Sequence, residues 1–208
     1  MLTEAKKVLA LKLFDIGAIK FGAFRLKLHE KNPEAPLSPI YIDLRILRSF
    51  PDVMDLAVDV YRELTSGLNF DMIADVPTAA TPIIAILSNK TRVPMISPRK
   101  EEKKYGVKRQ IDGVFKEGQV ALLVDDLITF ADSKIEAISV LKENNIMVHD
   151  VVVLLDREQG GFEELRKRGY NCHVAFKLKD LLKLYLKCGE ISPEQYERTN
   201  AYLEGSPA

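Results

Sequence analysis

Three short apolar runs are the clearest pattern along the chain. They cover residues 71–77, 120–126 and 151–157, and each is rich in β-branched side chains and ends in a polar or turn-forming residue. Apolar runs without polar alternation are typical of strands that are covered on both faces. The pattern therefore predicts three central strands of a parallel sheet.

The segments between these runs have helical spacing. Ile135, Ile138 and Leu141 recur at three-residue steps, and residues 54–66 and 80–90 behave similarly. Strands that alternate with helices predict right-handed crossover units and an α/β fold with an open, mostly parallel sheet.

The polar ends of the three runs are the first candidates for a functional site. Ligands of such sheets bind beyond the carboxyl ends of the strands. Pro77, Asp125, Asp126 and Arg157 are therefore expected to face one crevice.

The two ends of the chain fall outside this pattern. Lysines break the first apolar segment, which predicts an amphipathic helix rather than a signal peptide. A proline-containing stretch at 30–39 predicts a loop that leads into an edge strand or flap at 40–45. Residues 178–208 predict helices with a break at Ser192–Pro193.

Composition narrows the class of ligand. Thirty basic and thirty acidic residues cancel, so no charge excess marks a nucleic-acid binder, and a small anionic ligand fits better. Cys172 and Cys188 are too few for a disulfide framework, and their spacing matches no metal-site pattern. No apolar run approaches the length that spans a bilayer. We expect a single domain that binds neither nucleic acid nor membrane and works in the cytoplasm.

The second apolar run leads into a candidate phosphate-binding turn. Up to residue 134 it reads V-A-L-L-V-D-D-L-I-T-F-A-D-S-K, a strand, a turn and a helix start that would present bare backbone N–H groups to an anion. The turn has no glycine and carries Asp132. Asp125 and Asp126, at the strand end, could both reach a cis-diol, and solvated carboxylates are the alternative.

Basic residues crowd the loop at 98–113. They are Arg99, Lys100, Lys103, Lys104, Lys108 and Arg109. Such density suits a lid that captures and releases a polyphosphate, and a solvated charged loop is the alternative.

Arg157 follows the third apolar run, in D-R-E-Q-G-G at 156–161. Its guanidinium could form a two-pronged bond to a ligand carboxylate, and a structural salt bridge is the alternative. Gly160 and Gly161 permit a tight turn with positive φ.

Five stretches together carry a family resemblance. They read I-K-F-G-A-F-R-L-K at 19–27, S-P-I-Y-I-D-L-R at 38–45, R-K-E-E-K-K-Y-G at 99–106, L-L-V-D-D-L-I-T at 122–129 and V-V-V-L-L-D-R-E-Q-G-G at 151–161. In this order they resemble orotate phosphoribosyltransferase, including the N-terminal half of the eukaryotic UMP synthases, over most of the chain.

The resemblance implies a type I phosphoribosyltransferase fold in a single domain, 1–208. Residues 1–45 would form the N-terminal helix and a hood, residues 46–177 the core sheet and its helices, and residues 178–208 the C-terminal helices. It also implies a homodimer with shared active sites, because the family's mobile basic loop reaches into the neighbouring subunit.

The resemblance further implies transfer of ribose 5-phosphate from phosphoribosyl pyrophosphate to N1 of orotate, with Mg²⁺, to give orotidine 5′-monophosphate and pyrophosphate. The residues it implies as catalytic are Lys103, Asp125 and Asp126. Those implied to bind phosphoribosyl pyrophosphate are Thr78, Ala79, Arg99, Lys100, Lys103, Tyr105, Asp125, Asp126, Leu127, Ile128, Thr129, Phe130, Ala131, Asp132 and Ser133. Those implied to bind orotate are Lys27, Tyr41, Ile42, Thr129 and Arg157, and no metal site made by the protein itself is implied.

The phosphate loop departs from the family pattern, which usually reads like Thr-Thr-Gly-Gly-Ser. If the glycine that Ala131 replaces needed positive φ, Ala131 adds strain of about 1 kcal/mol. Asp132 is a favourable residue to cap the following helix with its own carboxylate. Pointing inward, it would repel a phosphate about 4 Å away by roughly 4 kcal/mol at an effective dielectric of 20, and pointing outward it would not.

Two further departures concern the other ligand contacts. Thr78 and Ala79 stand where the family commonly has a tyrosine followed by a small residue or lysine, and Leu28 follows Lys27 where serine is common. Three hypotheses therefore stay open: an active orotate phosphoribosyltransferase, a catalytically weak homologue with a nucleotide-binding or regulatory role, and a phosphoribosyltransferase for another base.

Overall fold

The computed structural model describes residues 2–25, 28–99 and 110–205. Its core is a six-stranded sheet with the order β5-β4-β3-β6-β7-β8. The strands are β3 (Met72–Asp75), β4 (Met95–Pro98), β5 (Ile111–Asp112), β6 (Val120–Ile128), β7 (Met147–Asp156) and β8 (Asn171–Lys177). All neighbours pair in parallel except β5, which is antiparallel to β4. The three apolar runs are confirmed as the adjacent strands β3, β6 and β7.

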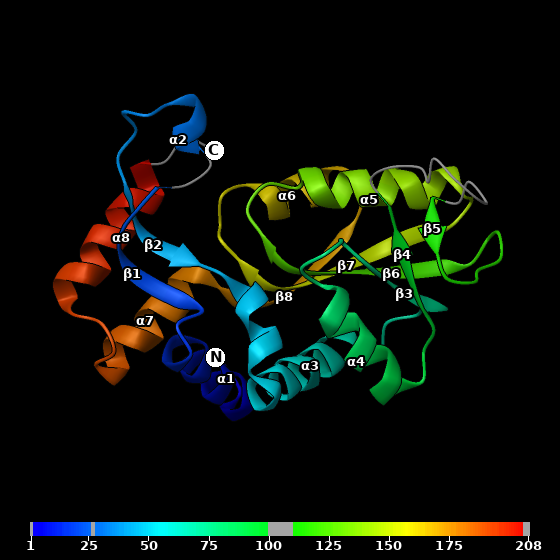
Figure 1. Cartoon of the computed structure of the whole chain (residues 1–208), viewed down its shortest axis with the longest axis horizontal. Helices are drawn as coiled ribbons and strands as arrows, with labels where there is room; N and C mark the ends of the chain where they lie inside the picture. The colour runs from blue at the N-terminus through cyan, green and yellow to red at the C-terminus, as the bar shows by residue number, and fades with distance from the viewer. Residues whose placement is uncertain (1, 26–27, 100–109, 206–208) are drawn as a thin grey trace.

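Helices cover both faces of this sheet. Figure 1 shows α3 (Pro51–Thr65) and α4 (Thr81–Thr91) below it, and α5 (Asp132–Glu143) and α6 (Gly161–Lys167) above it. Two apolar clusters fill the two interfaces between sheet and helices. The predicted helices at 54–66 and 80–90 and the one after residue 133 are confirmed within a few residues.

The ends of the chain gather on one side of the core sheet (Figure 1). The elements there are α1 (Glu4–Asp15), β1 (Ile19–Phe24), α2 (Leu28–Lys31), β2 (Ser38–Ile42), α7 (Leu178–Cys188) and α8 (Pro193–Gly205). β1 and β2 form an antiparallel pair, and α8 packs against β2. A 3-10 helix, η1 (Leu44–Ser49), leads from this pair back to the core. The amphipathic first helix, the strand after the proline stretch and the break before Pro193 are confirmed.

The alternation of β6 decides how its carboxylates point. Leu122 and Val124 belong to the cluster beneath α3, whereas Ala121 and Leu123 belong to the cluster beneath α5. Since successive side chains of a strand point to opposite faces, Asp125 continues the α5 face and Asp126 the α3 face.

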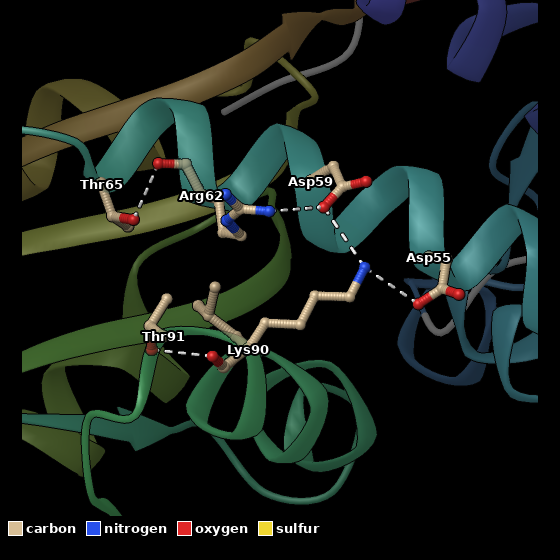
Figure 2. Close-up of polar contacts among 7 residues, drawn as sticks. Asp55, Asp59, Arg62, Thr65, Lys90 and Thr91 are labelled. Carbon is tan, nitrogen blue, oxygen red and sulfur yellow. Dashed lines mark hydrogen bonds and ion pairs between the residues drawn. The ribbon is translucent and has the colours of Figure 1, made fainter.

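Ion pairs on the surface orient α4, which follows the loop at 76–80. Figure 2 shows Lys90 of α4 between Asp55 and Asp59 of α3, with Nζ 3.1 Å and 3.2 Å from their Oδ1 atoms. Arg62 also pairs with Asp59, at 3.3 Å. Exposed ion pairs contribute about 1 kcal/mol or less each, so most of the stability of this contact comes from buried apolar side chains. In α4 these are Ile83, Ile84 and Leu87.

Two further features concern the cysteines and the helices. Cys172 and Cys188 are free thiols. Within the three described ranges, no helix combines the length and the apolar character needed to cross a membrane.

Candidate active site

The two adjacent carboxylates lie inside β6 rather than beyond its end. The strand continues to Ile128, so the prediction that it ends at Asp125 and Asp126 is wrong. Both side chains are nearly buried, with 4% and 8% of their surface exposed. The strand tolerates them because each oxygen-rich group finds donors: the backbone N–H of Asp126 donates to Asp125 Oδ1 at 2.9 Å, and that of Leu127 to Asp126 Oδ1 at 2.7 Å.

Asp125 forms a buried ion pair with Lys134 of α5. Lys134 is 3% exposed, and its Nζ also donates to the carbonyl oxygen of Leu127 at 2.5 Å. No sequence pattern marks Lys134, because a lysine in the first turn of an amphipathic helix is typical of a solvated side chain. The carboxylate of Asp125 is therefore already compensated within the protein.

Among the described residues, no cation forms an ion pair with Asp126. Burial, followed by the negative charge of Asp125, raises its pKa to about 7, and the positive charge of Lys134 opposes that rise. On the same side, the hydroxyl of Tyr61 donates to the backbone carbonyl of Asp125 at 2.7 Å. The negative charge of Asp126 also helps to raise the pKa of Arg45, on η1. The guanidinium of Arg45, however, is paired with Asp43, with Nε 2.7 Å from Oδ1. Of the two adjacent carboxylates, Asp126 is therefore the one that can accept hydrogen bonds from a ligand without first breaking an ion pair.

The loop between β6 and α5 is unstrained. Ala131 has φ −87° and ψ −3°, so the strain expected from replacing a glycine is absent. Helix α5 begins at Asp132, its N-cap residue is Ala131, and no side chain caps it. The expectation that Asp132 caps the helix with its own carboxylate is therefore wrong, and its side chain is exposed to solvent.

The backbone of this loop offers donors to an anion. Within the described parts of the chain, the N–H groups of residues 130–133 have no hydrogen-bond acceptor. These groups stand at the start of α5, where the helix dipole also favours negative charge. Of the loop residues, Thr129 and Ser133 are half-buried and Phe130 is 47% exposed.

Two glycines support the loop from α6. Gly160 has φ +95°, which confirms the tight turn with positive φ. Gly161 donates its N–H to the carbonyl oxygen of Thr129 at 3.1 Å. A Cβ on Gly161 would lie 2.8 Å from that oxygen and 2.7 Å from Cγ1 of Ile128, so only glycine permits this close approach.

Arg157 follows β7 beside the same loop, and its backbone N–H donates to the carbonyl oxygen of Ile128 at 2.9 Å. Its Nε is buried and has no acceptor among the described residues. Burial lowers the pKa of the guanidinium. Among the described side chains, only the phenol of Tyr202, on α8, acts to raise that pKa. No carboxylate in the described part of the chain forms a salt bridge with Arg157, so the alternative of a structural salt bridge has no support there.

The predicted orotate contacts of β2 are divided between its two faces. Tyr41 is half-buried, with its ring 5.5 Å from that of Phe24. Ile42 is 9% exposed and packs in the apolar cluster with Ile40, on the opposite face of the strand. The side chains of Tyr41 and Ile42 therefore point to opposite faces of β2. Lys27 lies outside the described residues.

The predicted pyrophosphate contacts lie around the ends of β3 and β4. Thr78 and Ala79 stand in the loop before α4, where Nη2 of Arg48 donates to the carbonyl oxygen of Thr78 at 3.4 Å. Asp75, at the end of β3, is fully buried and accepts a hydrogen bond from the hydroxyl of Thr81, which anchors this loop. No sequence motif marks Asp75 or Arg48 as part of the site.

Arg99 is held at the edge of the site by an ion pair with Asp112 across the β4–β5 pair. A cavity of about 270 Å³ lies between Pro77, which follows β3, Arg99, which follows β4, and the α5 residues Ser133 and Glu136. Lys100, Lys103 and Tyr105, expected to bind pyrophosphate, lie outside the described residues, as do Lys104, Lys108 and Arg109.

The described residues contain no group of three or more histidine, cysteine, aspartate or glutamate side chains placed to hold a metal ion. Mg²⁺ commonly binds through one or two carboxylates together with substrate phosphates.

Comparisons with known proteins agree with this geometry. No family model matches the chain. It is 36% identical over 193 residues to the orotate phosphoribosyltransferase of Pyrobaculum aerophilum, covering 92% of this chain and 96% of that protein. It is 34% identical over 194 residues to the uridine 5′-monophosphate synthase of Bos taurus, covering 92% of this chain and 39% of that protein.

A solved structure gives the same result. The UMP synthase of Leishmania donovani superposes with a TM-score of 0.85 at 36% identity, covering 97% of this chain and 43% of that one. The chain thus spans about two fifths of the longer relatives, 39% of the bovine enzyme, and nearly the whole of the Pyrobaculum protein. With a type I phosphoribosyltransferase fold and this similarity, the chain belongs to the orotate phosphoribosyltransferase family.

Proposed function

We propose that the chain transfers ribose 5-phosphate from phosphoribosyl pyrophosphate to N1 of orotate, giving orotidine 5′-monophosphate and pyrophosphate, a step of pyrimidine nucleotide synthesis. Membership of the family carries this proposal. The arrangement at the ends of β6 and β7 supports it, because free backbone N–H groups, a carboxylate and an arginine with no carboxylate partner among the described residues lie on adjacent segments.

Each of these groups matches one part of the two substrates. The N–H groups of residues 130–133 would bind the 5-phosphate at the start of α5. Asp126 would accept hydrogen bonds from the ribose hydroxyls. Arg157 would pair with the carboxylate of orotate through two parallel hydrogen bonds.

Catalysis would depend on positioning and charge. As the bond to pyrophosphate breaks, positive charge develops on the ribose and negative charge on the leaving group. Asp126, beside the ribose, would stabilise the first, and Arg99 with the basic residues of the loop would stabilise the second. Mg²⁺, bound to the oxygens of phosphoribosyl pyrophosphate, would neutralise further negative charge on the leaving group.

The structure weakens the case for a catalytically impaired homologue. That hypothesis depended on strain at Ala131 and on a capping carboxylate at Asp132. Ala131 has an ordinary negative φ, and Asp132 caps nothing. For a different base, the buried guanidinium of Arg157 favours an acidic acceptor over a neutral one.

The same proposal includes a cytoplasmic homodimer with shared active sites. The family resemblance supports the dimer, and the cysteine content supports a reducing compartment. Light scattering of the purified chain measures its oligomeric state directly. A monomer at all concentrations would contradict the homodimer.

The reaction is tested by the loss of orotate absorbance after phosphoribosyl pyrophosphate and Mg²⁺ are added. We expect turnover with orotate and none with adenine or hypoxanthine. Absence of turnover with orotate in a folded protein, or faster release of pyrophosphate with a purine, would contradict the proposal.

Asp132→Asn is expected to tighten binding of phosphoribosyl pyrophosphate by up to about fivefold at low salt, because an exposed carboxylate in the first turn of α5 would still repel a phosphate bound at that helix start, by roughly 1 kcal/mol or less through water. High salt should abolish the gain. Titration calorimetry measures both. Asp52→Asn is the matched control, since Asp52 is also exposed in the first turn of a helix, α3. Equal affinities of wild type and Asp132→Asn at low salt would show that Asp132 does not influence the phosphate.

A further inference from the structure

A buried ion pair joins β6 to α5 directly beneath the phosphate loop. Lys134 and Asp125 have 3% and 4% of their surface exposed. The Nζ of Lys134 contacts the carboxylate of Asp125, the carbonyl oxygen of Leu127 at 2.5 Å and Oγ of Ser133 at 3.4 Å. The three donors of the ammonium group thus have acceptors inside the protein. Lys134 has no donor left for a substrate.

The position of Lys134 is unfavourable for a lysine in two ways. Burial of an ammonium group costs several kcal/mol before its partners are counted. The first turn of a helix also disfavours positive charge, because the helix dipole is positive there. Replacing both Lys134 and Asp125 by apolar side chains would avoid both costs, so stability alone gives no reason for this buried pair.

The contacts of Lys134 bracket the phosphate loop. Leu127 precedes the loop, and Lys134 follows it in the first turn of α5. The hydrogen bond from Nζ to the carbonyl oxygen of Leu127 therefore ties the two ends of residues 128–133 together. This tie fixes the direction of the backbone N–H groups in a loop that has no glycine of its own.

The same ammonium group separates the roles of the two carboxylates. It neutralises Asp125 on the α5 face and leaves Asp126 on the other face. A ligand that carries phosphates then meets one uncompensated carboxylate instead of two. Both effects of Lys134 favour binding of the phosphorylated substrate.

We propose that Lys134 is a positioning residue for phosphoribosyl pyrophosphate: it clamps the ends of the phosphate loop and neutralises Asp125, so that the loop N–H groups and Asp126 alone face the substrate. This inference rests on the proposed function. Lys134 would then control the affinity for phosphoribosyl pyrophosphate although its buried side chain does not touch this substrate.

The test compares Lys134→Met with Lys142→Met. Methionine keeps the length of the side chain and removes its charge, and Lys142 is an exposed lysine two turns later on the same helix. For Lys134→Met we expect the KM for phosphoribosyl pyrophosphate to rise about tenfold or more and the KM for orotate to change less than about threefold. Lys142→Met should match the wild type. A folded Lys134→Met protein with wild-type KM for phosphoribosyl pyrophosphate would overturn the proposal, since a purely structural lysine would alter melting alone.

Loss of the lysine leaves Asp125 as an uncompensated buried charge, which can prevent folding. The comparison is therefore repeated in an Asp125→Asn background, where that charge is absent and the tie to Leu127 is retained. We expect the added Lys134→Met change to weaken binding of phosphoribosyl pyrophosphate by about fivefold in titration calorimetry. Equal affinities of the single and double variants would overturn the clamp.

Binding and turnover separate this inference from the proposed function. If the wild type binds phosphoribosyl pyrophosphate but does not transfer it to orotate, the proposed reaction fails, and the calorimetric comparison still tests Lys134. If the wild type does not bind phosphoribosyl pyrophosphate at all, both proposals fail.

Discussion

Arg157→Lys is expected to raise the KM for orotate by about 100-fold, equivalent to roughly 2.7 kcal/mol, while the KM for phosphoribosyl pyrophosphate stays within about threefold. The guanidinium is planar and offers two parallel donors to a carboxylate, whereas the ammonium group of lysine offers a single point of charge. In this protein Nε of Arg157 is buried, and burial lowers the pKa of the guanidinium. Such a group gains most from a ligand that supplies the missing negative charge.

Steady-state kinetics with orotate and with uracil measures this effect. Uracil lacks the carboxylate, so the wild type should prefer orotate strongly and Arg157→Lys should lose most of that preference. Arg166→Lys, an exposed change on α6, is the control for altered surface charge. An unchanged preference for orotate in Arg157→Lys would show that this arginine has a structural role and that another group selects the base.

The sequence predicted the core of this fold well because the central strands are buried on both faces. The uninterrupted apolar and β-branched character of residues 151–155 favours a strand covered on both faces, and this segment is indeed the inner part of β7. The prediction failed where polar residues occur inside a strand. The acidic pair Asp125–Asp126 predicts the end of β6, but the strand continues to Ile128.

The reason for this failure is a contact that sequence spacing does not reveal. A carboxylate can continue a buried strand when a distant cation compensates it, and Lys134 does so from the next helix. The role of Asp132 was missed for a related reason. Its residue type favours capping, but α5 begins at Asp132 itself, so its side chain lies one position too late to cap the helix.

Asp126→Asn is expected to lower kcat/KM at pH 8 by about 10- to 100-fold, because a hydrogen bond to a charged group contributes about 1.5–3 kcal/mol. The wild-type kcat/KM should rise with pH through about 7, the pKa to which burial and the neighbouring Asp125 raise Asp126. The variant should lose this step. The other charged or titratable groups that influence Asp126 are Lys134, Tyr61 and Arg45, and all three stay in the variant.

The same substitution should stabilise the protein. The pKa of Asp126 is about 7 in the folded chain, against an ordinary value of 3.8, so the folded state holds a proton between these pH values that the unfolded state has lost. Wild-type stability therefore falls as pH rises from about 4 to about 7 and is level above that. Asparagine does not ionise, so the melting temperatures of Asp126→Asn and wild type should agree near pH 4 and differ by several degrees at pH 8, with the variant higher.

Activity and stability would then change in opposite directions at one residue, which distinguishes a functional carboxylate from a structural one. Asp52→Asn, at an exposed site, serves as the control and should change neither the activity nor the pH dependence of melting. A lower melting temperature for Asp126→Asn at pH 8 would mean that the ionised carboxylate is satisfied within the protein. In that case Asp126 would stabilise the fold, and the charge beside the ribose would have to come from another residue.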